Sequence, residues 1–118
     1  MTDRRPQWVY ASGDEPDPRF SLANERTFLA WMRTSIGILA GAVALHSLDL
    51  PADDGLRTPV LLLLLLLAAG SAVTATVRWA RVERAMRLRE PLPASYAGLV
   101  LTAAIVLIAA VLAVVVVA

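Results

Sequence analysis

The C-terminal stretch of the chain, from Ala94 to Ala118, contains no charged side chain. At about 1.5 Å per residue, a helix of this length exceeds the roughly 30 Å hydrocarbon core of a bilayer. Two earlier stretches, at about 27–48 and 59–77, also have the length and apolar composition of membrane-spanning helices. The sequence therefore predicts an all-α membrane protein with three transmembrane helices.

The composition supports this fold class and excludes several functions. The 118 residues are 58% hydrophobic, with a mean hydropathy of +0.63, which is too apolar for an ordinary soluble domain. Cysteine is absent, which excludes disulfides, thiolate metal ligands and cysteine nucleophiles. The sequence contains no nucleophile–base pattern, phosphate-binding loop or nucleic-acid motif. We therefore expect no enzymatic activity, no cofactor or metal, and no nucleic-acid partner.

The first helix has a recognisable start. Asp17 is a good N-cap, and Pro18 suits the first helical position, where no amide hydrogen bond is required. Apolar character continues to Leu48, which corresponds to roughly 45 Å of helix. Because this exceeds the hydrocarbon core, we expect a long first helix whose first turns project into the cytoplasm. The polar residues 1–17 are expected to form a mobile cytoplasmic tail, and residues 18–118 the membrane domain.

The distribution of arginines predicts the orientation. The two polar regions before span one and after span two are rich in arginine, whereas the loop between spans one and two has only Arg57 beside several aspartates. By the positive-inside rule, the N-terminus is cytoplasmic and the C-terminus is outside. We therefore expect a multi-pass membrane protein in this orientation.

Three arginines at the start of span one share one helical face. Arg19, Arg26 and Arg33 are one heptad apart, so successive side chains differ by only about 20° around the helix. A charge near lipid is costly unless it faces water, protein or a partner. The row therefore indicates an anion-binding surface or a pore wall. For Arg33 the alternative is that the side chain extends toward the headgroups.

Two other features concern helix packing. Asn24 and Glu25 lie beside Arg26, and a pairing of Glu25 with Arg78 or Arg81 of another helix is expected to form a cytoplasmic clamp. Further along, Gly37 and Gly41 form a GxxxG pair. Such small residues allow close approach of membrane helices, so this pair indicates either dimerisation or a narrow apolar stretch of pore. Both alternatives bring copies of the first helix together.

Two motifs resemble those of a known family. Residues 22–34, with the sequence LANERTFLAWMRT, resemble the signature of the YidH-like family, which contains the domain of unknown function (DUF) 202. Residues 78–86, RWARVERAM, followed by EPLP at 90–93, resemble the basic linker of that family after span two. Together with the three spans, the resemblance covers nearly the whole chain after residue 17. It implies a multi-pass protein of the bacterial inner (plasma) membrane.

The domain is also similar to the membrane part of the eukaryotic vacuolar transporter chaperone complex, a polyphosphate polymerase. In that complex, five three-helix domains surround a polyanion channel lined by their first helices. The resemblance implies that Arg19 and Arg26 line a pore and that Asn24 and Glu25 belong to the shared motif. Arg33 departs from the eukaryotic pattern. The chain has no room for the cytosolic polymerase domain, so polymerase activity is not implied.

These observations lead to two hypotheses. The first is a homo-oligomeric, arginine-lined pore that binds and conducts anions or polyphosphate, with a pentamer favoured by the resemblance. The second is a non-conducting scaffold or accessory subunit whose cytoplasmic arginines bind anionic membrane lipid or a partner protein.

Overall fold

The computed structural model describes residues 4–47, 54–93 and 96–117. The elements follow one another as α1 (Gln7–Tyr10), α2 (Pro18–Ser47), α3 (Asp54–Arg87) and α4 (Ala97–Val117). All regular structure within these ranges is helical, and α2, α3 and α4 are each long and apolar enough to cross a membrane. The predicted fold class, an all-α protein with three transmembrane helices, is therefore confirmed.

Both ends of α2 are capped by neighbouring side chains. The backbone N–H of Arg19 donates to Oδ1 of Asp17 at 2.9 Å, which is the predicted N-cap arrangement. At the other end, the guanidinium of Arg57 donates to the carbonyl oxygens of Leu45 and His46, both at 2.9 Å. These carbonyls lie in the last turn, where intrahelical partners are missing, so Arg57 stabilises the end of α2.

α3 is longer than the predicted span. It begins at Asp54 rather than near Pro59, which lies inside the helix, and it continues through the basic stretch to Arg87. Its C-terminus is a Schellman motif, in which the N–H of Glu90 donates to the carbonyl of Ala85 at 2.9 Å. Arg89 takes the left-handed position in this motif, with φ of 55°. α3 therefore extends more than two turns beyond the span expected at 59–77.

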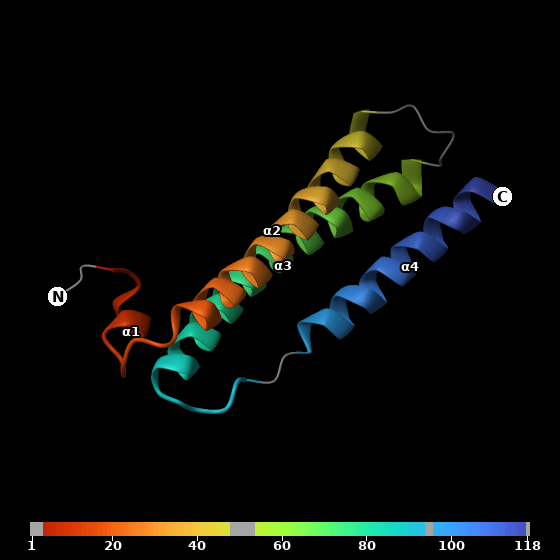
Figure 1. Cartoon of the computed structure of the whole chain (residues 1–118). Coiled ribbons are helices and arrows are strands. Elements are labelled where there is room, and N and C mark those ends of the chain that lie inside the picture. Colours follow the sequence, from red (N-terminus) through yellow and green to blue (C-terminus); the bar gives the residue numbers. More distant parts are fainter. Residues whose placement is uncertain (1–3, 48–53, 94–95, 118) are drawn as a thin grey trace.

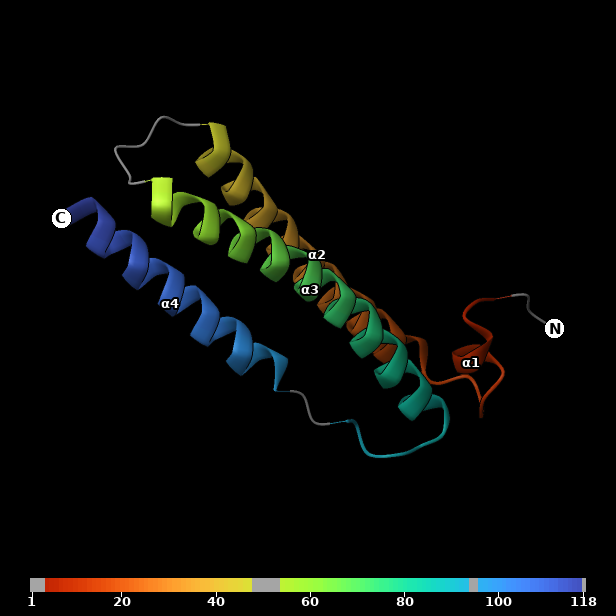
Figure 2. The same ribbon diagram turned by 180° about the vertical axis from the view of Figure 1, so that it is seen from behind.

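The helices α2 and α3 form an antiparallel pair, and α4 lies alongside α3 (Figures 1 and 2). Much of the buried surface between α2 and α3 consists of small side chains, which allow the two backbones to approach closely. These are Ser35, Ala42, Ala68, Ser71 and Ala75. Near the connection between α2 and α3, the larger side chains Leu45, Val60 and Ile108 form one buried cluster that includes α4. Elsewhere, the described side chains of α4 are largely exposed.

The N-terminal segment differs from the mobile tail that the sequence predicted. Residues 4–17 contain the short helix α1 and fold against the C-terminal end of α3. Val9 of α1 is fully buried, and the N–H of Asp14 donates to the carbonyl of Arg87 at 3.0 Å. Residues 1–3 lie outside the described part of the chain, as do residues 48, 94, 95 and 118 at the predicted span ends.

Candidate functional site

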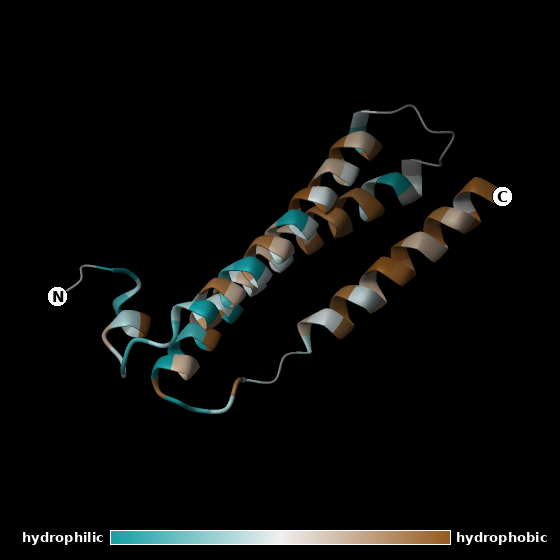
Figure 3. Ribbon diagram, in the orientation of Figure 1, coloured by the Kyte–Doolittle hydropathy of each residue, from teal (hydrophilic) through white to brown (hydrophobic). Residues whose placement is uncertain are grey.

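The arginine row lies on the face of α2 opposite α3. The buried residues Asn24 and Ser35 define the side of α2 that contacts α3. Arg26 follows Asn24 by two residues, and Arg33 precedes Ser35 by two, which is about 200° of rotation in each case. Both arginines are exposed. Figure 3 shows hydrophilic positions recurring along α2, whereas α4 is apolar or neutral throughout.

The three arginines of the row have different surroundings. The Arg19 guanidinium forms a salt bridge with Asp17 at 2.9 Å, and the Arg19 side chain is 85% exposed. Hydrogen bonds from the side chain and backbone of Arg19 lower the pKa of Asp17. Arg26 and Arg33 form no ion pair or hydrogen bond with any other described residue. Two unneutralised charges therefore remain on the free face of α2.

The two glycines of the GxxxG pair are exposed in the single chain. A Cβ atom added to Gly37 or Gly41 would have no neighbouring atom within 4 Å, apart from the local helix backbone. The absence of their side chains is therefore not required for packing of α2 against α3. Both glycines remain available for contact with another copy, and the prediction that they pack helices stays a prediction.

A buried hydrogen-bonded cluster connects the start of α2 to α3. The hydroxyl of Ser21 donates to Oε2 of Glu83 at 2.7 Å. Nδ2 of Asn24 donates to the carbonyl of Trp79 at 3.0 Å and to Oε1 of Glu83 at 3.3 Å. Asn24 and Glu83 are only 5% and 4% exposed. We refer to Ser21, Asn24, Trp79 and Glu83 as the polar clamp.

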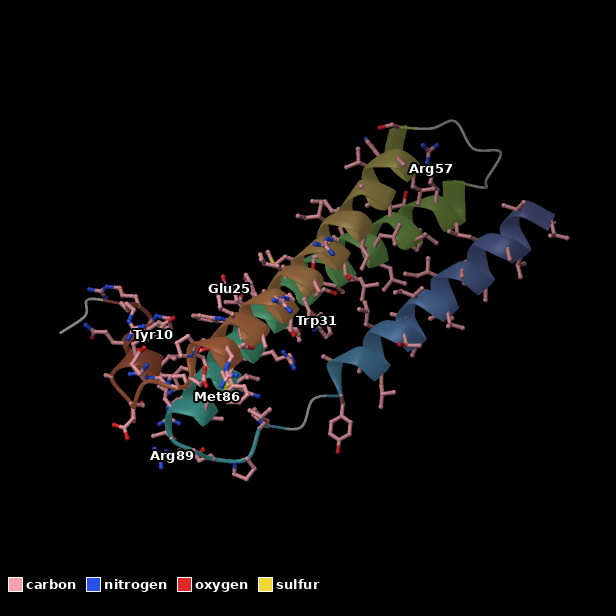
Figure 4. The ribbon with its side chains drawn as sticks, viewed as in Figure 1. Tyr10, Glu25, Trp31, Arg57, Met86 and Arg89 are labelled. Carbon is pink, nitrogen blue, oxygen red and sulfur yellow. The ribbon has the colours of Figure 1, made fainter. Side chains whose placement is uncertain are left out.

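The polar clamp replaces the ion pair that the sequence predicted. Glu25 is exposed and forms no salt bridge with Arg78, Arg81 or any other described residue. Figure 4 shows Glu25 on the outer side of α2. One residue corresponds to about 100° of rotation, so Asn24 faces α3 and Glu25 does not. Asn24, which the sequence analysis placed beside Glu25 in the expected clamp, contacts α3 through Trp79 and Glu83. Glu83 was not among the predicted site residues.

The N-terminal segment is attached to α3 mainly through Arg87. This side chain is 6% exposed and donates to the carbonyls of Tyr10 and Ser12 at 2.9 and 2.8 Å and to Oε1 of Glu15 at 2.8 Å. Glu15 also pairs with Arg4. A Cβ at Gly13, whose φ is +53°, would lie 2.0 Å from the carbonyl oxygen of Arg87. The close approach therefore requires glycine at this position.

We expect attachment of this segment to weaken in acid. Hydrogen bonds from Arg4 and Arg87 lower the pKa of Glu15 below its ordinary value of 4.5. A lowered folded-state pKa stabilises the attached state above pH 4.5, and this contribution is lost as the pH falls through the folded pKa. Hydrogen-exchange protection of the Asp14 amide should therefore decrease below about pH 4. The same decrease in Glu15→Gln would contradict this assignment.

These features define a small multi-pass membrane protein with a charged row on one helix. A family model described as "Domain of unknown function (DUF202)" matches residues 19–85, more than half of the chain. The chain belongs to this family, as the motifs in residues 22–34 and 78–86 predicted.

Several curated relatives are similar to the chain. It is 47% identical over 102 residues to inner membrane protein YidH of Escherichia coli, covering 82% of this chain and 85% of the relative. The values are the same for YidH of Shigella flexneri. An uncharacterized protein of Mycobacterium tuberculosis is 47% identical over 87 residues, covering 70% of this chain and 69% of the relative. No solved structure matches the chain. Together with the three apolar helices, these relatives identify a multi-pass inner membrane protein.

Proposed function

We propose that the protein assembles into a homo-oligomer in which the arginine face of α2 lines a path for anions, including polyphosphate. The observation that carries this proposal is the exposure of Arg26 and Arg33 opposite α3, without an ionic partner among the described residues. A charged side chain in a membrane helix is stabilised by water or by a partner, and copies of the chain around a common axis provide both.

The protomer has the arrangement that such an assembly needs. α3 covers the side of α2 that faces away from the arginines, and the apolar α4 lies against α3. With α2 at the centre, α4 would contact lipid. A guanidinium presents a planar fork of donors that suits phosphate oxygens, so rings of Arg26 and Arg33 would bind phosphate groups. The family resemblance favours five copies.

We also propose that the N-terminus is cytoplasmic and the C-terminus outside. The basic end of α3 and the start of α2 lie at the same end of the molecule, because Asn24 contacts Trp79 and Glu83. The positive-inside rule places this end, and the projecting first turns of α2, in the cytoplasm. A cysteine replacing Asp54 should react with an impermeant thiol reagent from outside, and one replacing Arg84 should not. The reverse pattern would contradict the orientation.

Anion efflux from liposomes tests the proposed function. Liposomes containing the purified protein should release chloride or tripolyphosphate at a rate proportional to protein content. Liposomes that contain the oligomer but stay sealed to both anions would instead support a non-conducting scaffold that binds anionic lipid or a partner protein.

A further inference from the structure

Two adjoining cavities lie between the α2–α3 pair and α4. The larger, about 450 Å³, is bordered by the middle of α3 and the first half of α4, from Leu63 to Thr74 and from Ala97 to Ala104. The smaller, about 340 Å³, lies toward the N-terminal end of α2. Trp31 and Leu101 border both cavities, so the two adjoin, and we call them together the α4 groove.

The two ends of the α4 groove differ in chemistry. The larger cavity is lined by leucines, valine and small residues, with Ser71 and Thr74 as its hydroxyl-bearing residues. The smaller is lined by Arg26, two threonines, Ala30, Trp31 and Leu101. The hydroxyls of Thr27 and Thr34 already donate to carbonyls one turn earlier, of Ala23 and Ala30. Arg26 is therefore the one charged donor among the described residues that line the groove.

The polar end lies at the same end of the molecule as the N-terminal segment. Arg26 precedes Trp31 by five residues, about 8 Å along α2, whereas the apolar part extends for about 16 Å along α3. Figure 4 shows Trp31 on the side of the α2–α3 pair that faces α4. Tryptophan is common at the boundary between headgroups and hydrocarbon. The groove therefore changes from apolar to cationic in the direction in which a lipid changes from chain to headgroup.

We propose that the α4 groove binds one anionic phospholipid per protomer, with an acyl chain along α3 and α4 and the phosphate on Arg26. The charge of Arg26 complements a headgroup with net negative charge, and the apolar wall complements a chain. This inference does not depend on conduction, but it shares Arg26 with the proposed function: an Arg26 guanidinium that holds a lipid phosphate in the α4 groove leaves Arg33, which does not line the groove, for the anion path.

The charge at one end of the groove favours a lipid over a helix from a second copy. The phosphate of a lipid supplies a negative charge for Arg26, whereas the apolar spans 27–47, 59–77 and 97–117 contain no carboxylate. An acyl chain can lie beside the small residues Gly70, Ala97 and Ala104. The expected occupant is therefore a lipid.

Native mass spectrometry of delipidated protein, with phosphatidylglycerol and phosphatidylcholine added in equal amounts, tests the proposal. We expect one retained phosphatidylglycerol per protomer, with a preference of about tenfold, since a charge-assisted hydrogen bond contributes at least this factor. Arg26→Gln should remove the preference. Arg81→Gln, which removes an exposed charge that does not line the groove, should retain it. Equal losses in both variants would overturn the proposal.

A variant that fills the groove distinguishes a lipid-binding site from a non-specific attraction of anionic lipid to the charge of Arg26. A Cβ at Gly70 would meet no atom within 4 Å, so the side chain of Gly70→Leu can enter the groove without a clash at its first atom. Gly70→Leu, or Ala104→Leu if the first variant does not fold, should retain at least fivefold less of both lipids with Arg26 intact. The proposal would be contradicted if lipid retention were unchanged, or if only the oligomeric state changed. It would also be contradicted if excess inorganic phosphate displaced the bound lipid completely. Efflux that persists in the filled variants would separate this site from the anion path.

Discussion

Arg33→Gln is expected to reduce anion efflux by about tenfold to a hundredfold while the oligomer persists. Arg33 is the deepest arginine of the row, is exposed on the face opposite α3, and does not line the α4 groove. Each copy loses one charge-assisted donor of about 1.5–3 kcal/mol, which corresponds to this range of rate. Glutamine preserves most of the polarity, so the substitution tests the charge itself.

The salt dependence of efflux provides an independent measurement. Mobile ions screen exposed charges more strongly as ionic strength rises, so efflux in the wild type should depend on salt more steeply than efflux in Arg33→Gln. Arg81→Gln removes an exposed charge of α3 outside the row and should change efflux by less than twofold. Arg33→Gln could instead lose the oligomer while the remaining oligomers show normal efflux. That result would mean that Arg33 contributes to packing between copies and is not part of an anion path.

Glu83→Ala is expected to reduce the free energy of unfolding by about 2–4 kcal/mol. The substitution removes the acceptor for the Ser21 hydroxyl and one of the two acceptors for the Asn24 amide. Because Asn24 is only 5% exposed, water cannot readily replace the lost carboxylate. The fluorescence of Trp79, whose carbonyl belongs to the same clamp, can follow unfolding in detergent, with the other two tryptophans replaced.

Glu83→Gln is the matched control. Its amide oxygen can accept from Ser21 or from Nδ2 of Asn24 but not from both, because Oε1 and Oε2 of Glu83 each accept one of these bonds and the amide replaces one oxygen with an NH₂ donor. We therefore expect a loss of about 1–2 kcal/mol, smaller than in Glu83→Ala. Equal losses in the two variants would show that packing, and not hydrogen bonding, is what Glu83 contributes.

Much of the fold could be predicted because it depends on local properties of the sequence. The apolar length of each span identifies three helices regardless of how they pack. The start of α2 was also predictable, because Asp17 caps the helix by accepting a hydrogen bond from the backbone N–H of Arg19, two residues away. The end of α3 was harder to predict from the sequence, because its Schellman motif has Arg89 in the left-handed position instead of the usual glycine. The register of the arginine row follows from helical geometry alone.

The contacts between helices could not be predicted in the same way. Glu83 lies in a stretch dense with arginines, where no local pattern indicates burial, although it is 4% exposed. Asn24 and Trp31 are seven residues apart, and Ser35 follows one turn later, so the three side chains lie on one side of α2. This spacing indicates which side of α2 packs against α3, but not which residues of α3 it contacts. Attachment of the N-terminal segment depends on Arg87 meeting three carbonyl or carboxylate oxygens distant in sequence, which no local pattern indicates.

In the proposed assembly, the arginine faces of several α2 helices meet around a common axis. Ala40 lies one heptad after Arg33, continues the arginine row and is exposed. Because the chain contains no cysteine, Ala40→Cys introduces a single thiol. With a short bis-maleimide crosslinker in native membranes, Ala40→Cys should yield covalent dimers. Val106→Cys, on the exposed surface of α4, should yield none. Crosslinking through Val106→Cys, with Ala40→Cys remaining monomeric, would contradict an assembly around α2.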